Sequence, residues 1–185
     1  FYFDKAANFY WQLNDTDNAI LNFGKALTNS KKIGNTNGIK VIYTNLGLIY
    51  SDKSNYKLAA ENFFFFLAAS RKLGRKPDVA ASLLNLSSAQ IEIADYSGAE
   101  KSLSEVQKIA QELNDQKLLK NCYFNFNKLY EKQGNQSKAA EYFNLFAMLT
   151  KKIQSEELKE KEMKAKQMVD SAGKVVQQIS AEKDI

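Results

Sequence analysis

The stretch LGLIYSDKSNYKLAAENF, residues 46–63, has the pattern of two amphipathic helices joined by a short polar turn. Apolar residues recur at spacings of three and four on both sides of Ser54-Asn55, as helices with one buried face require. Ser and Asn favour turns because their side chains bond to nearby backbone groups. The stretch therefore predicts a helical hairpin.

The same pattern recurs along the chain, and equivalent residues are 40 positions apart. Small residues mark the second helix of each unit at Ala19, Ala59, Ala99 and Ala139. Large apolar residues follow one turn later at Phe23, Phe63, Leu103 and Phe143. We therefore predict four units, at 1–34, 35–74, 75–114 and 115–153. Their expected helix pairs are 1–13 with 16–33, 36–53 with 56–73, 76–93 with 96–113, and 116–133 with 136–153.

Composition excludes several classes of site. Of 185 residues, 44% are hydrophobic and 25% are charged, as in soluble globular proteins. The single cysteine, Cys122, excludes an internal disulfide and a cysteine zinc site. The chain has no histidine, which excludes histidine-dependent triads and imidazole metal ligands. We predict no catalytic residue, no metal site and no cofactor, and we interpret Cys122 as a buried side chain rather than a reactive thiol.

The compartment stays open at this level. No apolar run approaches the ~20 residues of a membrane-spanning helix, and no signal-peptide pattern opens the chain. The first residue is Phe1 rather than Met, which indicates a piece of a longer or processed protein. Targeting or membrane segments would then lie in the flanking sequence, so a cytoplasmic and a periplasmic location are both compatible with these residues. No membrane contact is predicted within them.

These residues resemble the tetratricopeptide repeat family. Leu46-Gly47, Tyr50, Tyr56, Ala59 and Phe63 match the pattern of that family. The other units match it more loosely, with Ala6-Ala7, Leu86-Ser87 and Phe126-Asn127 in place of the Leu-Gly pair. The resemblance implies an all-α fold, a right-handed superhelical solenoid of four helix pairs followed by a long C-terminal helix. It also implies a non-enzymatic module that binds a protein or peptide.

In this family the first helices line a concave groove. The groove positions that follow from the resemblance are Thr44, Asn45, Leu48, Leu84, Asn85, Ser88, Ile91, Phe124, Asn125 and Lys128. The three asparagines recur at the repeat period. Because a carboxamide both donates and accepts, such a ladder suits the backbone of an extended peptide. Alternatively the asparagines pair within the groove, which the C-terminal helix then fills or which stays empty.

The basic clamp found in receptors for chaperone tails is missing from the chain. In those members of the family, a Lys or Arg grips the terminal carboxylate of the ligand. The corresponding positions here are Asp4, Thr44 and Leu84. Recognition of a C-terminal carboxylate is therefore not expected.

Residues 154–185 depart from the repeat and carry a heptad pattern. Leu158, Ala165, Ala172 and Ile179 are seven residues apart, and apolar residues at Met168, Val169, Val175 and Val176 lie three or four positions after two of them. One interpretation is a helix that caps the last unit, and the other is a helix that continues as a dimeric coiled coil. The arrangement resembles the sensor regions of bacterial tetratricopeptide-containing histidine kinases, which would make the chain part of a two-component signalling protein.

Two further features leave alternatives open. Phe63–Phe66 cannot all face one side of a helix, so Phe64 and Phe65 are either partly buried against a neighbour or an exposed patch for self-association or a partner. The net charge of +5 and the pI near 9.1 raise the possibility of nucleic-acid binding. However, many cations lie at expected helix C-termini, where they complement the helix dipole. A protein-binding module is the leading hypothesis, ahead of a dimerisation scaffold and of a nucleic-acid-binding regulator.

Overall fold

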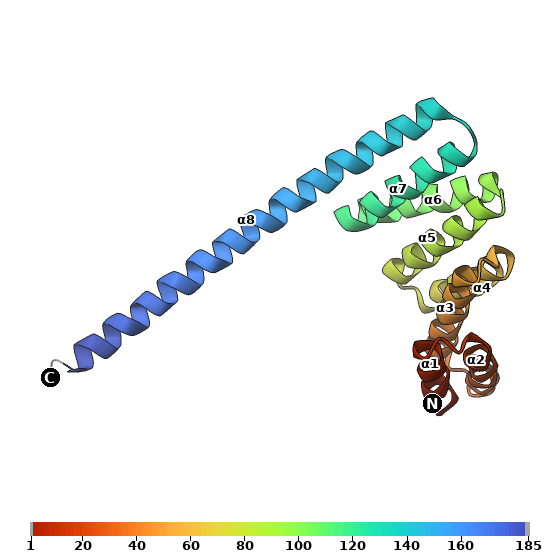
Figure 1. Ribbon diagram of the computed structural model, residues 1–185, viewed down its shortest axis with the longest axis horizontal. Helices are drawn as coiled ribbons and strands as arrows, with labels where there is room; N and C mark the ends of the chain where they lie inside the picture. The colour runs from red at the N-terminus through yellow and green to blue at the C-terminus, as the bar shows by residue number, and fades with distance from the viewer. Residues whose placement is uncertain (1, 184–185) are drawn as a thin grey trace. The chain divides into compact units, whose positions relative to one another are not determined.

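The computed structural model describes the backbone of residues 2–183 and the side chains of residues 2–174. Across these residues the chain forms eight α-helices and no strand. Their bounds are α1 (Tyr2–Gln12), α2 (Thr16–Lys32), α3 (Thr36–Asp52), α4 (Tyr56–Leu73), α5 (Lys76–Glu92), α6 (Tyr96–Glu112), α7 (Gln116–Lys132) and α8 (Gln136–Lys183). Helices α1 to α7 pack against their sequence neighbours in order (Figure 1). The prediction of an all-α helical-repeat solenoid is confirmed.

All seven turns between the helices share one backbone feature. Each turn contains one residue with a positive φ, at Asn14, Gly34, Ser54, Gly74, Ala94, Asn114 and Gly134. The residue that follows is the N-cap of the next helix. Side chains of Asp15, Asn35, Asn55, Asp95 and Asp115 each accept a bond from a backbone N–H three residues on. Arg75 makes no such bond, and Pro77 instead suits the first turn of α5.

The predicted end of the last helix near residue 153 is wrong, because α8 continues to Lys183. The residues with a positive φ are spaced evenly along the chain, from Asn14 to Gly134, and the next one in this series would be Gln154. Gln154 is helical instead. In α3, the buried residues are Ile42, Leu46 and Ile49 among others. The equivalent positions of a fifth unit would be Glu162, Lys166 and Val169. Because two of these three positions are charged, burial at this register offers little to offset the cost of another turn.

Two apolar clusters form the core of the repeats. The first lies among α1, α2 and α3 and contains Phe23, and the second extends from α3 to the start of α8 and contains Phe63 and Leu103. These three large side chains are at most 2% exposed, whereas the equivalent Phe143 is 55% exposed. A Cβ on Gly47 would overlap the Phe63 ring, so the glycine lets that ring lie directly on the α3 backbone.

The chain divides into two compact units, Phe1–Phe146 and Ala147–Ile185. The first unit holds α1 to α7 with the beginning of α8, and the second holds the rest of α8. Among the described residues, no helix contains a stretch that is long and apolar enough to cross a lipid bilayer.

Candidate functional site on the first helices

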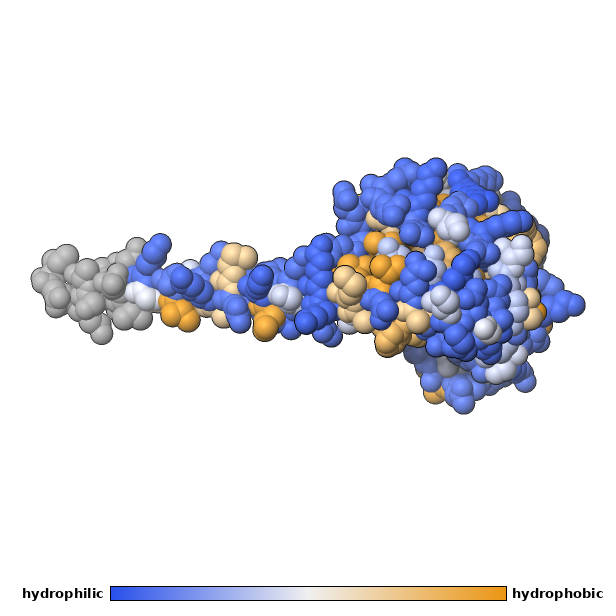
Figure 2. All heavy atoms as spheres, turned by 90° about the horizontal axis from the view of Figure 1, so that it is seen from above, coloured by the Kyte–Doolittle hydropathy of each residue, from blue (hydrophilic) through white to orange (hydrophobic). Residues whose placement is uncertain are grey.

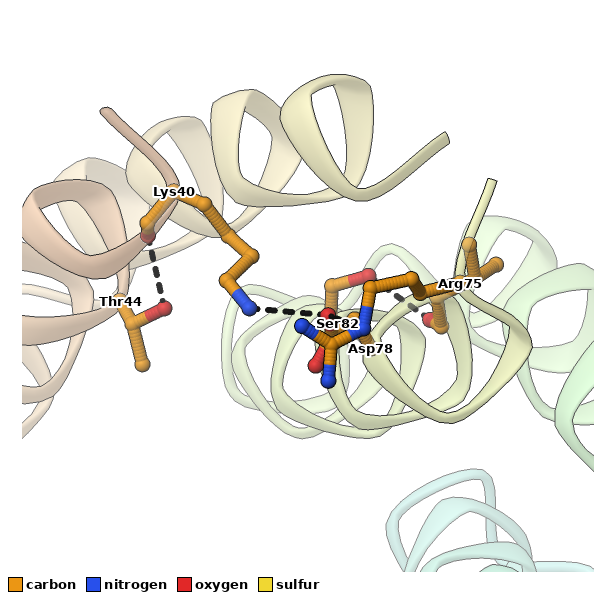
Figure 3. Close-up of polar contacts among 6 residues, drawn as sticks. Lys40, Thr44, Arg75, Asp78 and Ser82 are labelled. Atoms are coloured by element: carbon orange, nitrogen blue, oxygen red, sulfur yellow. Dashed lines mark hydrogen bonds and ion pairs between the residues drawn. The ribbon is translucent and has the colours of Figure 1, made fainter. Parts of the chain in front are cut away.

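The first helices of units two and three are joined by a half-buried ion pair. Lys40 Nζ of α3 lies 2.8 Å from Asp78 Oδ2 of α5, and their side chains are 12% and 20% exposed. Arg75 Nε approaches the same carboxylate oxygen at 3.2 Å, so two cations converge on Asp78 (Figure 3). Thr44 donates its hydroxyl to the Lys40 carbonyl at 2.9 Å. The predicted groove residue Thr44 therefore has its donor engaged within its own helix.

Two of the three predicted asparagines bond to the preceding unit. Asn45 Nδ2 donates to Asn8 Oδ1 at 3.3 Å, and Asn125 Nδ2 donates to Ser88 Oγ at 3.1 Å. Asn8 and Ser88 occupy equivalent positions in units one and three. Asn125 is buried at 9% exposure and also lies within 3.4 Å of the Leu84 carbonyl oxygen. These two amides therefore pair across adjacent first helices, as the alternative interpretation of the ladder proposed.

Asn85 differs because of the residue that faces its register. Unit one has Asn8 and unit three has Ser88 at this position, but unit two has Leu48. The leucine side chain cannot accept a hydrogen bond from Asn85. Within residues 2–174, no side-chain hydrogen bond to the Asn85 amide is formed, and this side chain is half-buried. Its two donors and its acceptor are thus available to an incoming ligand.

A hollow of about 280 Å³ opens at the C-terminal ends of the same helices. Its lining consists of Ser51, Asp52, Tyr56, Ser88, Ala89, Ile91, Glu92 and Lys128. We call it the first-helix hollow. Ile91 is 2% exposed and belongs to the core, so it leaves little surface for a ligand. The charged and hydroxyl side chains therefore give the hollow its chemistry.

Charges around this hollow are only partly paired. Glu92 Oε2 accepts a hydrogen bond from Lys132 Nζ at 3.0 Å, and this bond raises the pKa of Lys132. Lys128 Nζ lies 5.2 Å from the ring centroid of Phe124, in cation–π range. Phe124 is 42% exposed and its ring also contacts Phe146 at 5.4 Å between centroids. Phe124 and Lys128 thus present a cationic, aromatic surface beside the polar hollow.

The remaining predicted residues divide between the core edge and the surface. Leu48 and Leu84 are partly buried against the core. On α8, Met168 and Val169 are 72% and 70% exposed. Figure 2 shows isolated apolar side chains among hydrophilic ones along this helix. The side chains of Val175, Val176 and Ile179 lie outside the described residues.

Asp52, Tyr56 and Glu92 are among the lining residues of the first-helix hollow that the sequence predictions did not include. A signal for two of them was present, because Asp52, Glu92 and Lys132 recur at the repeat period and all lie at C-terminal ends of first helices. No group of three or more Cys, Asp or Glu side chains able to hold a metal ion occurs in the part of the chain that the structure describes.

Comparison with known proteins supports the same architecture. A sequence profile described as tetratricopeptide repeat matches residues 2–32. No curated protein matches the chain in sequence. The crystal structure of BtubC (BKLC) from P. vanneervenii has a TM-score of 0.73 at 19% identity, over 82% of this chain and 63% of that one. The apo form of RapI has a TM-score of 0.53 at 18% identity, over 80% of this chain and 67% of that one.

At these identities the two structures show the fold alone, and the chain spans less than two thirds of the length of BtubC. The repeat columns in the sequence, the match at residues 2–32 and the stacked helix pairs agree with one another. The chain therefore contains a segment that matches a tetratricopeptide repeat, at residues 2–32, within a helical-repeat fold.

Proposed function

We propose that the chain is a non-enzymatic interaction module that binds an extended peptide segment of a partner protein along α3, α5 and α7. The observation that carries this proposal is the half-buried Asn85 amide, which lacks the partner that Asn45 and Asn125 have. An extended peptide offers one N–H donor and one carbonyl acceptor per residue. A carboxamide satisfies both at once without selecting a side chain.

The first-helix hollow would accept one side chain of the same peptide. Its volume of about 280 Å³ suits a single large side chain, and its walls combine carboxylates, hydroxyls and Lys128. Ser88 contributes to the hollow and lies on the same helix face as Asn85, three residues away. A ligand side chain with a polar tip therefore fits this hollow better than a purely apolar one.

Replacing Asn85 with Ala should leave the melting temperature nearly unchanged and weaken peptide binding by about 1–2 kcal/mol. Replacing Asn125 with Ala is the matched control, because it removes the same group from a residue that is buried and bonded to Ser88. That variant should lose stability by about 1–3 kcal/mol. Calorimetric titration with a peptide selected by phage display, together with thermal unfolding, measures both effects.

Unchanged affinity of the Asn85→Ala protein for the selected peptide would place the binding site away from this surface. Loss of stability in both variants, without a difference between them, would show that Asn85 is bonded within the protein after all. Only the combination of weaker binding at Asn85 and weaker folding at Asn125 supports the proposal.

A sensor or adaptor role in a bacterial signal-transduction protein is the more specific form of this function. It is supported by the 40-residue period, which is similar to that of the longer tetratricopeptide variant of bacterial regulators. A phosphoacceptor histidine followed by an ATP-binding domain in the same polypeptide would establish the two-component form of this role.

Self-association through α8 is a second candidate function, which the exposed apolar residues Leu158, Met168 and Val169 of the heptad pattern favour. Apolar residues at heptad spacing bury their surface by pairing with a second helix. A protein truncated after Glu160 should therefore sediment as a monomer, whereas the full chain should form a weak dimer. Met168→Glu with Val169→Glu should have the same effect as truncation. A full chain that sediments as a monomer at high concentration would contradict this candidate.

A further inference from the structure

A second hollow, separate from the first-helix hollow, lies among α2, α3 and α4. Its volume is about 310 Å³, and its lining consists of Lys31, Thr36, Ile39, Tyr43, Phe65, Ala68, Ala69 and Lys72. We call it the aromatic hollow. The Phe65 ring stacks on Tyr43 with centroids 4.9 Å apart, and Phe64 meets Phe65 edge-on at 6.0 Å. Phe64 and Phe65 are nevertheless 58% and 47% exposed, so they form a surface patch.

The next unit contains an equivalent hollow in which the charges are paired. Its lining is Arg71, Gly74, Lys76, Val79, Glu105, Lys108, Ile109 and Glu112. Arg71 Nη2 lies 2.7 Å from Glu105 Oε2, and Lys76 Nζ lies 2.8 Å from Glu112 Oε2. Two cations on the wall of this hollow are therefore neutralised by two carboxylates of α6.

The aromatic hollow lacks both of these carboxylates. At the repeat register, Phe65 stands in place of Glu105 and Lys72 in place of Glu112. Lys31, the equivalent of Arg71, lies over the Tyr43 ring at 5.7 Å from its centroid. Among the described residues, neither Lys31 nor Lys72 forms a salt bridge. The site thus combines an aromatic floor with two cations whose counterions are missing from the chain.

We propose that the aromatic hollow is a docking site for an acidic segment of a partner protein. An apolar or aromatic side chain of that segment would contact Tyr43, Phe65 and Ile39. Flanking Asp or Glu side chains would pair with Lys31 and Lys72. Charge complementarity supports a carboxylate ligand, because the neighbouring hollow binds carboxylates with the equivalent cation. This site shares no lining residue with the first-helix hollow, so it is a second surface for a second partner or segment.

The probe for this site is a short fluorescent peptide whose single tryptophan is flanked on both sides by glutamates. In fluorescence anisotropy with the full chain, the peptide should bind, and its affinity should fall as salt screens the lysines. The double variant Phe65→Glu with Lys72→Glu places carboxylates in the aromatic hollow at the positions that Glu105 and Glu112 occupy in the neighbouring hollow. This change should weaken binding at least about tenfold, or about 1.4 kcal/mol. Lys72→Glu alone changes an exposed side chain and should weaken binding in the same direction.

The controls separate this site from other surfaces. Phe143→Glu alters a phenylalanine of similar exposure outside the hollow, and Asn85→Ala alters the first-helix surface. Both variants should bind the acidic peptide as the unaltered chain does. Loss of acidic-peptide binding in either variant would overturn the proposal. If Asn85→Ala does not weaken binding of the selected peptide in the earlier test, the proposal for the first helices fails but the one for the aromatic hollow does not.

Other occupants give different results. Equal binding of a peptide with lysines in place of the glutamates, or with alanine in place of the tryptophan, would overturn the proposal. Displacement of the peptide by a single-stranded oligonucleotide at lower concentration would reassign the hollow to nucleic acid. An oligomer of the unaltered chain that dissociates in the double variant, without any peptide binding, would reassign it to a second copy of the chain.

Discussion

Phe63→Ala is expected to lower the free energy of unfolding by about 3–5 kcal/mol, the range observed when a buried phenylalanine is truncated. Phe63 is 2% exposed and its ring lies directly against the Gly47 backbone. Two rigid helices, α3 and α4, form the walls of the resulting cavity, so the site cannot collapse around a methyl group. Because each unit contacts only its neighbours, damage at this interior position also weakens the continuity of the stack. Denaturant titration followed by circular dichroism measures the loss.

The chain supplies a matched control at the equivalent position two units later. Phe143 is 55% exposed, so Phe143→Ala should cost less than about 1 kcal/mol. The two substitutions remove the same atoms from the same repeat column. Similar losses in both variants would contradict the packing described above, since they would require Phe143 to be buried in solution.

The difference between Phe63 and Phe143 marks a limit of repeat-based prediction. The residue of unit four that is equivalent to Gly47 is Asn127. Asn127 Nδ2 donates a hydrogen bond to the Ala139 carbonyl at 3.1 Å. A carboxamide thus occupies space between the helices that unit two leaves to the Phe63 ring. The sequence places both phenylalanines in one column, but the residue opposite them decides whether the ring is buried.

The helix boundaries, in contrast, could be predicted within about one residue for the first seven helices. Their ends depend on local chemistry, namely a residue that tolerates a positive φ followed by an N-cap such as Asp15 or Asn35. The end of α8 had no such local signal. We attribute its length to the charged residues Glu162 and Lys166, which stand where α3 has core residues and are recognised only by comparison with α3.

The candidate site was predicted only in outline. The asparagine column identified residues on the correct helices, but their bonding depends on the residue 37 positions earlier, which is Asn8, Leu48 or Ser88. This offset reflects how adjacent first helices pack, and no pattern within a single helix shows it. The aromatic hollow was not predicted either. That it lacks two carboxylates is recognised only when its lining is compared with that of the neighbouring hollow.

Cys122 is expected to react with iodoacetamide about a thousandfold more slowly in the folded chain than in the unfolded chain. Its side chain is fully buried, and Sγ donates to the Leu103 carbonyl at 3.3 Å. Burial raises the pKa of the Cys122 thiol from an ordinary value of 9.0 to about 12. The thiolate is the reactive form, and each pH unit changes its fraction about tenfold at neutral pH. Labelling followed by mass spectrometry, with and without denaturant, measures the ratio.

The same shift predicts how stability depends on pH. A pKa raised by folding favours the neutral thiol, so its contribution is complete below pH 9 and is lost as the pH rises towards 12. Tyr130 acts in the same direction, since burial and its hydrogen bond to Glu100 raise its pKa from 10.0 to about 12. Unfolding should therefore require less denaturant at each step above pH 9.

The variant Cys122→Ser distinguishes the contribution of the thiol to the pH dependence from that of Tyr130. The chain itself shows that serine fits the equivalent position of another repeat unit. Ser82 is the equivalent residue of unit three, is buried and donates to the Val79 carbonyl at 2.7 Å. Cys122→Ser should therefore fold, and because its hydroxyl does not ionise in this range, its stability should fall less between pH 9 and 12. An identical alkaline profile for both proteins, or rapid labelling of the folded chain at neutral pH, would show that the thiol is accessible to water.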